Sequence, residues 1–127
     1  MSQQSPLADK RILVVEDEYF IARDLERALR AADAIVIGPV ATLEQGLNLA
    51  ATQTLDAAVL DVNLSGERAF EIADRLTERD VPWTFLTGYD EWALPAPYRS
   101  ASIVAKPFQA DRVIRAIGAL MPDKGCA

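Results

Sequence analysis

The sequence predicts an α/β protein in which a doubly wound, five-stranded parallel sheet is covered by helices on both faces. Five short apolar runs alternate with amphipathic stretches along the 127 residues, and this alternation is typical of parallel sheets with right-handed crossovers. The central run, residues 57–61, is apolar until it ends on a carboxylate, as expected of a strand buried on both faces. We expect the strand order 2-1-3-4-5, which is known among small doubly wound proteins.

The composition excludes several classes of function. Half of the residues are hydrophobic, enough for the core of one domain, and the formal net charge of −6 argues against a nucleic-acid partner. The chain has no histidine, which excludes histidine zinc clusters and histidine-based catalysis. Residues 1–10 lack the apolar segment of a secretory signal and no stretch approaches a membrane span, so we expect a cytoplasmic protein without membrane insertion. We expect a flexible arm over residues 1–10, one domain over 11–121 and a tail over 122–127.

The first half of the chain predicts two strand–helix units. Residues 11–15 form a β-branched apolar run, which predicts a buried strand. Apolar side chains then recur at helical spacing over roughly residues 19–31. Residues 35–37 predict a second strand, closed by Gly38-Pro39. A capping-box pattern predicts a helix that begins after Thr42 and runs to about residue 52.

The second half predicts three more strands and two long helices. The third strand is the central run, followed by a loop and a helix over about residues 67–79. A fourth strand covers residues 81–86, a fifth covers 102–105, and a last helix runs from about 109 to 120. Between the last two strands, Pro95 and Pro97 prevent a long helix. We therefore expect the fourth helix of the domain to be short or irregular.

Four of the five strands end on a reactive polar side chain. The first ends at Glu16 and Asp17, the third at Asp61, the fourth at Thr87 and the fifth at Lys106. The carboxyl ends of parallel strands meet at one edge of the sheet, where ligands bind. Converging carboxylates attract a hard cation such as Mg²⁺ or Mn²⁺. A carboxylate is also a nucleophile toward phosphorus, and a lysine and a hydroxyl can hold the other phosphoryl oxygens. The pattern therefore indicates phosphoryl transfer to Asp61.

Four motifs in this order and spacing resemble the receiver domains of bacterial two-component response regulators, over roughly residues 10–120. The motifs are Leu13–Glu18, Leu60–Leu64, Leu86–Gly88 and Lys106–Phe108. The resemblance implies a flavodoxin-like fold of the CheY-like kind. It also implies that a sensor histidine kinase or a phosphotransfer protein delivers a phosphoryl group to the chain. The domain would catalyse its own phosphorylation from phosphohistidine and its own dephosphorylation, and would signal by protein–protein contact or by passing the phosphate on.

The resemblance also implies a role for each site residue. Asp61 would be the phosphoacceptor, and Thr87 and Lys106 would bind the phosphoryl group. The metal ligands would be Glu16, Asp17, Asp61 and the backbone carbonyl of Asn63. Pro107 would follow a cis peptide bond.

The chain departs from most receivers at the position three residues before the lysine. Most carry Phe or Tyr there, whereas this chain has Ile103, so the usual inward swing of an aromatic ring cannot occur. Residues 82–89 are similar to the signature Pro-Phe-x-Phe-Ala-Thr-Gly-Tyr of a subgroup whose members often stand alone and pair with kinases of the HWE or HisKA_2 type. We expect the switch to involve Thr87, Gly88, Tyr89 and a local repacking of Ile103, with the signal leaving through residues 88–98.

Three other functions stay open. The domain could be an interaction module that signals without phosphorylation, although an intact set of Asp61, Thr87 and Lys106 argues against this. It could be a phosphohydrolase of the haloacid dehalogenase kind, but Asn63 stands where that family has a second Asp. A flavodoxin-like cofactor binder needs a phosphate-cradling loop after the first strand, and three acidic residues there have the wrong charge.

Overall fold

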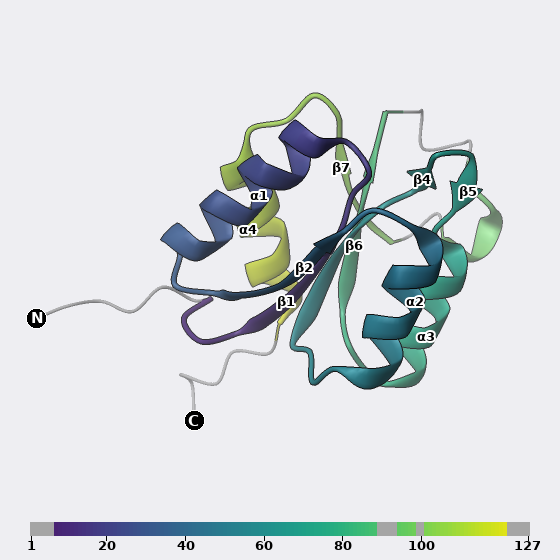
Figure 1. Ribbon diagram of the computed structural model, residues 1–127, viewed down its shortest axis with the longest axis horizontal. Helices are drawn as coiled ribbons and strands as arrows, with labels where there is room; N and C mark the ends of the chain where they lie inside the picture. Colours follow the sequence, from purple (N-terminus) through teal and green to yellow (C-terminus); the bar gives the residue numbers. More distant parts are fainter. Residues whose placement is uncertain (1–6, 89–93, 99–100, 122–127) are drawn as a thin grey trace, which may run out of the picture.

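A five-stranded parallel sheet forms the centre of the molecule in the computed structural model, which describes residues 7–88, 94–98 and 101–121 (Figure 1). The strands are β1 (Arg11–Val15), β2 (Ile35–Val40), β3 (Ala57–Asp61), β6 (Trp83–Thr87) and β7 (Ser102–Ala105). They lie in the order β2-β1-β3-β6-β7, and each neighbouring pair is parallel. This confirms the predicted order 2-1-3-4-5 and the doubly wound fold.

Two pairs of helices cover the two faces of the sheet (Figure 1). The helices are α1 (Tyr19–Ala31) with α4 (Ala110–Leu120), and α2 (Leu43–Thr52) with α3 (Phe70–Glu78). The alternation of side chains along β1 shows how both faces of the sheet become buried. Ile12 and Val14 pack with residues of α1 and α4, whereas Leu13 and Val15 pack with residues of α2 and α3. Because successive side chains of a strand point to opposite faces of the sheet, β1 contributes to the hydrophobic core on each side.

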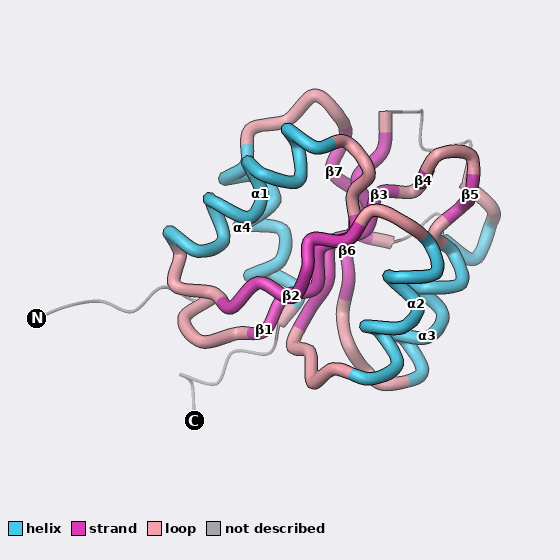
Figure 2. Tube along the Cα trace, in the orientation of Figure 1, coloured by secondary structure: helices cyan, strands magenta, loops and turns pink. Residues whose placement is uncertain are grey.

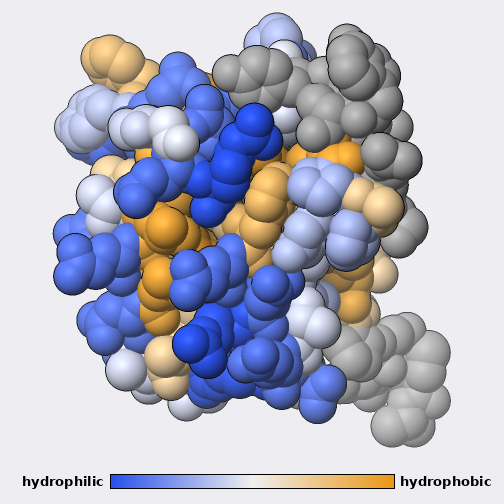
Figure 3. Space-filling model, turned by 90° about the vertical axis from the view of Figure 1, so that its right-hand side faces the viewer, coloured by the Kyte–Doolittle hydropathy of each residue, from blue (hydrophilic) through white to orange (hydrophobic). Residues whose placement is uncertain are grey.

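The outer surface of α2 and α3 is mostly hydrophilic, with apolar residues visible in between (Figure 3).

At the start of α2, the backbone N–H of Gln45 donates to Thr42 Oγ1 at 3.1 Å. The Gln45 side chain accepts in turn from the N–H of Ala41 at 3.2 Å. The predicted Thr42 cap therefore forms, with the reciprocal bond of Gln45 going to the residue before the cap, and α2 begins where the sequence places it.

One helix begins later than the sequence predicts. The expected helix over 67–79 starts at Phe70, because β5 (Glu67–Arg68) pairs antiparallel with β4 (Asn63–Leu64). Figure 2 shows this small hairpin beside the main sheet. Ser65 and Gly66 make its turn with positive φ angles of 53° and 94°, a conformation that suits glycine and is uncommon for other residues. The hairpin carries the chain from the end of β3 to the start of α3.

Two further segments differ from expectation at their ends. β2 extends to Val40 rather than ending before Gly38, with a register shift between Leu13 and Val15 of β1. Leu7, placed by the sequence in a loose arm, is fully buried, and the N–H of Asp9 donates to Asp33 O at 2.8 Å. Packing of the domain therefore begins no later than Leu7.

Between β6 and β7 the structure describes one short 3₁₀ helix, η2 (Ala96–Tyr98). This agrees with the expectation that the fourth helix is short or irregular. Residues 89–93, which include Tyr89 and Trp92, lie outside the described residues. Within the part of the chain that is described, no helix has the length and apolar character that a membrane span requires.

Replacing Gly46 by alanine should destabilise the fold. A Cβ atom at Gly46 in α2 would lie 2.6 Å from Ile72 Cδ1 and 3.2 Å from Val15 Cγ2, both in the core, whereas one at Gly118 in α4 would meet no atom within 4 Å. Both changes gain the same helix propensity, so comparing them isolates the overpacking. We expect Gly46→Ala to have a free energy of unfolding about 1–3 kcal/mol below that of Gly118→Ala in urea titrations. Equal values would show that α2 has room at this position.

Candidate functional site

The polar residues at the strand ends come together at one edge of the sheet. Asp61 of β3 pairs in register with Leu86, which precedes Thr87 of β6, and Thr87 pairs with Ala105, which precedes Lys106. Glu16 follows directly after β1. Glu16, Asp61 and Thr87 are buried, with exposed fractions of 2%, 4% and 3%. The parallel pairing therefore brings together all four strand ends that the sequence singles out.

Lys106 contacts three carboxylates at once. Its Nζ lies 3.2 Å from Asp61 Oδ2, 3.0 Å from Glu18 Oε2 and 3.2 Å from Glu16 Oε1. The backbone of Lys106 is held as well, because its N–H donates to Thr87 O at 2.8 Å. The peptide bond between Lys106 and Pro107 is cis. The lysine is thus the cationic centre of the cluster, and Glu18 is a partner that the sequence analysis did not assign.

Burial shifts the protonation of the two inner carboxyls. Desolvation, together with a hydrogen bond shared with Asp61, raises the pKa of Glu16 to about 8. Desolvation also raises the pKa of Asp61, although its contacts with Glu16 and Lys106 act in the opposite direction. Burial by itself would lower the pKa of Lys106, but the hydrogen bond to Glu18 and the charges of Asp61 and Glu16 raise it above its ordinary value. At neutral pH the inner pair therefore shares a proton beside a charged lysine.

Asp17 lies on the rim of the same cleft. Its Oδ2 accepts from the N–H of Ser65 at 3.0 Å and from Ser65 Oγ at 2.9 Å. Burial opposes ionisation, but these hydrogen bonds outweigh it and hold the pKa of Asp17 below its usual value. The hairpin between β3 and α3 is thereby tied to the loop after β1. This tie joins two segments that the sequence analysis treated separately.

The carboxylates fit a divalent cation. Oxygen atoms of Glu16, Glu18 and Asp61 all lie within 4.8 Å of one another. Among the described residues, Glu16 Oε1 is a buried side-chain oxygen without a hydrogen-bond donor, although Lys106 Nζ is close in distance. An orphaned carboxylate oxygen beside other oxygen donors is what a hard cation requires. The cleft has a volume of about 450 Å³ and is lined by Asp17, Glu18, Asp61, Asn63, Ser65, Gly88 and Lys106.

Asn63 takes part through its backbone and its side chain. Its N–H donates to Asp61 Oδ1 at 3.2 Å, and its own Oδ1 accepts from the N–H of Gly66 at 2.8 Å. The side-chain amide is thus used within the hairpin turn. At the other side of the sheet edge, Ile103 is half-buried and packs against the core that contains Phe85. Tyr89, the remaining predicted switch residue, lies outside the described residues.

The comparisons with known proteins agree on one family. A family model for the response regulator receiver domain matches residues 12–118. The sensory transduction protein LytT of Bacillus subtilis is 35% identical over 107 residues, which is 81% of this chain and 44% of LytT. The chain therefore spans less than half the length of that relative.

Two solved structures are also similar over nearly the whole chain. The solution structure of SdrG from Sphingomonas melonis Fr1 matches with a TM-score of 0.77 and 38% identity, covering 94% of this chain and 98% of SdrG. The BeF3-activated conformation of SdrG, from Pseudomonas melonis Fr1, matches with a TM-score of 0.74 and 36% identity, covering 96% and 100%.

Because of the raised pKa of Glu16, the metal-free protein should lose stability as the pH rises. The folded protein keeps a proton on Glu16 that the unfolded chain releases above pH 4.5, so stability is lost between pH 4.5 and about 8. The Glu16→Gln variant has no carboxyl at this position to titrate, so this loss of stability is absent from it. In urea unfolding with chelator, its stability gain over wild type should be larger at about pH 9 than at about pH 5, by on the order of 2 kcal/mol.

Glu44→Gln, at an exposed position in α2, is the control and should stay within about 0.5 kcal/mol of wild type at both values of pH. A Glu16→Gln gain that does not change with pH would contradict a buried proton at this position.

Proposed function

Since the chain belongs to the response regulator receiver domain family, which matches residues 12–118, we propose that Asp61 is its phosphoacceptor. The observation that carries this proposal is the position of Asp61 at the floor of the cleft, 4% exposed, with Lys106 Nζ 3.2 Å from its Oδ2. Receivers of this family act as phosphoacceptors in two-component signalling, and their partners are sensor kinases or phosphotransfer proteins.

In the proposed reaction, a carboxylate oxygen of Asp61 attacks phosphorus and the bond between phosphorus and the donor imidazole breaks. The electron pair of that bond leaves with the imidazole nitrogen. Lys106 lies in place to bind a phosphoryl oxygen through a charge-assisted hydrogen bond. The hydroxyl of Thr87, at the end of the neighbouring strand, is the second donor that we assign to the phosphoryl group. Such a transfer needs mainly positioning and charge stabilisation.

We assign the cation to the acidic side of the cleft. Glu16, Asp17 and Asp61, with the backbone carbonyl of Asn63, would hold Mg²⁺ or Mn²⁺, which would offset the negative charge of an incoming phosphoryl group. The orphaned Oε1 of Glu16 and its closeness to oxygen atoms of Asp61 support these two ligands, whereas the third acid of the cluster in the metal-free structure is Glu18 and not Asp17. The contacts of Asp17 with Ser65 place it on the rim of the cleft.

The partner that we propose is a histidine kinase of the HWE or HisKA_2 type. Support comes from residues 82–89, which are similar to the Pro-Phe-x-Phe-Ala-Thr-Gly-Tyr signature of a subgroup that often pairs with such kinases. The downstream output would be contact with another protein.

Incubation with acetyl phosphate and Mg²⁺ should add the mass of one phosphoryl group to the wild-type protein. The gain should vanish in Asp61→Asn and in the presence of chelator, because the acceptor or the cation is then missing. Asp17→Ala should keep its fold and lose Mg²⁺ binding. Asp24→Asn, at an exposed position on α1, is the control and should be phosphorylated like wild type. Intact-mass spectrometry decides, and a gain that persists in Asp61→Asn would place the acceptor elsewhere.

We further propose that the switch runs from Thr87 through residues 88–98. Ile103 is β-branched and stiff, so it can only repack locally. The described end of this segment is anchored on α3: the Tyr98 ring stacks on Phe70 with centroids 4.6 Å apart, and Tyr98 Oη donates to Asp74 Oδ1 at 2.8 Å. An anchored end gives the segment a defined contact that a movement of Thr87 could alter.

Amide hydrogen exchange with and without beryllofluoride tests this route. Exchange across residues 88–98 should slow or change on activation, because a phosphoryl mimic on Asp61 offers the Thr87 hydroxyl a charged acceptor within the cleft. The matched reference is α2, which packs against β1, β2 and α3. Unchanged exchange across 88–98, with changes confined to other helices, would contradict the proposal.

A further inference from the structure

Glu18 occupies the N-cap position of α1 but does not cap the helix. Its backbone is extended, with φ −89° and ψ 115°, and its side chain accepts no capping hydrogen bond. The usual N-cap side chains are those of Ser, Thr, Asp and Asn, although a negative charge near this end of a helix is stabilised by the helix dipole. The Glu18 carboxylate instead lies 3.0 Å from Lys106 Nζ, a residue 88 positions away in the sequence. The Glu18 side chain thus contacts a distant lysine and not the first turn of its own helix.

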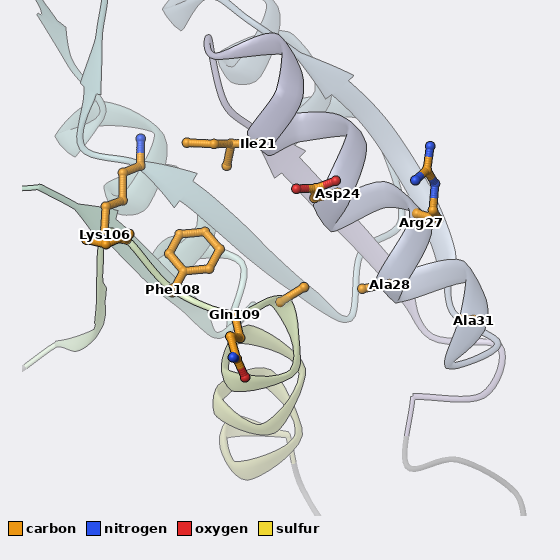
Figure 4. A pocket seen from close by; sticks show the side chains of 10 residues that line it. Ile21, Asp24, Arg27, Ala28, Ala31, Lys106, Phe108 and Gln109 are labelled. Carbon is orange, nitrogen blue, oxygen red and sulfur yellow. The ribbon is translucent and has the colours of Figure 1, made fainter.

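The three contacts of Lys106 use its hydrogen-bonding capacity. An ammonium group has three N–H donors, and Nζ donates to Glu16, Glu18 and Asp61. The lysine side chain is only 15% exposed, and it lines an apolar groove of about 540 Å³ together with Ile21 and Phe108 (Figure 4). A phosphoryl oxygen on Asp61 can therefore accept a hydrogen bond from Nζ only if one of the three carboxylates loses its own hydrogen bond from Nζ.

The solvent exposure of the three carboxylates indicates which of them loses its hydrogen bond from Nζ. The side chains of Glu16 and Asp61 are 0% and 6% exposed, whereas that of Glu18 is 60% exposed. A buried carboxylate that loses its cation has no water to replace it, but an exposed one is solvated at once. Glu18 is therefore the partner that Lys106 can leave at the lowest cost.

We propose that Glu18 is a positioning residue that holds Lys106 in the resting state and competes with the phosphoryl group for its ammonium. The competition slows phosphorylation of Asp61 and weakens the hold on the phosphoryl group. The negative charge of Glu18 at the cleft adds repulsion against an incoming anion. This inference rests on the proposed phosphoacceptor role of Asp61 and adds to it a residue that sets how readily the site is activated.

The test compares Glu18→Gln with Glu44→Gln, which removes the same charge at an exposed position of α2 outside the contacts of Lys106. Beryllofluoride binding at saturating Mg²⁺ should be about two- to fivefold tighter in Glu18→Gln, the range expected for losing one exposed ion pair. Phosphorylation by acetyl phosphate, in which Asp61 displaces acetate from phosphorus, should be faster by a similar factor. Glu44→Gln should match wild type in both measurements.

A beryllofluoride affinity of Glu18→Gln equal to or below that of Glu44→Gln would overturn the role of Glu18, and a weaker affinity would indicate a cation ligand instead. If wild type and both variants all fail to bind beryllofluoride, the proposed phosphoacceptor function fails, and the competition with it.

A second readout follows the contact itself in the metal-free protein. In Glu18→Gln, NMR of the Lys106 ammonium should show faster exchange with water and a lower pKa than in wild type, because the hydrogen bond to Glu18 raises that pKa. A change in helix stability alone would not move this signal. An unchanged Lys106 signal would overturn the proposal whatever the result with beryllofluoride.

Discussion

The site depends on one electrostatic constraint, which is that several carboxylates meet one ammonium at the carboxyl edge of a parallel sheet. Lys106 Nζ lies within 3.2 Å of Asp61, Glu18 and Glu16. Two of these carboxyls are buried; desolvation opposes the ionisation of both, and the neighbouring Asp61 also opposes that of Glu16. The resting cluster relieves this by keeping a proton on the inner pair. It is therefore a site in which a cation would replace a proton and an anion would replace a carboxylate partner of the lysine.

The fold divides the site into a fixed part and an exchangeable part. Asp61 and Thr87 belong to paired strands, and the backbone of Lys106 is bound to Thr87 O at 2.8 Å, so the sheet sets their separation. Asp17 and Glu18 instead lie in the loop after β1, and each makes its side-chain contacts with a distant segment. Contacts of loop residues can be exchanged without disturbing the sheet. Positioning for phosphoryl transfer would thus reside in the strands, and control in the loop.

Local patterns predicted the framework, and contacts between distant residues explain what sequence reasoning missed. The alternation of apolar runs predicted five strands in a parallel α/β fold, and helical spacing predicted α1 over residues 19–31, because both patterns depend on near neighbours. The strand order came from what is known of small doubly wound proteins. The start of α3 was wrong by three residues because the β4–β5 hairpin competes for residues 67–68. The partners of Asp17 and Glu18 lie 48 and 88 residues away. Glu18 could have been noticed only as a third acid after the first strand.

The number of protons released when Mg²⁺ binds tests the account most directly. If burial holds a proton on Glu16, whose pKa is raised to about 8, a cation must displace it. Calorimetry in buffers of different ionisation enthalpy should show about one proton released per Mg²⁺ near neutral pH and almost none well above pH 8. Glu16→Gln should release none at either pH. Mg²⁺ binding without proton release near neutral pH, or with equal release from Glu16→Gln, would contradict the account.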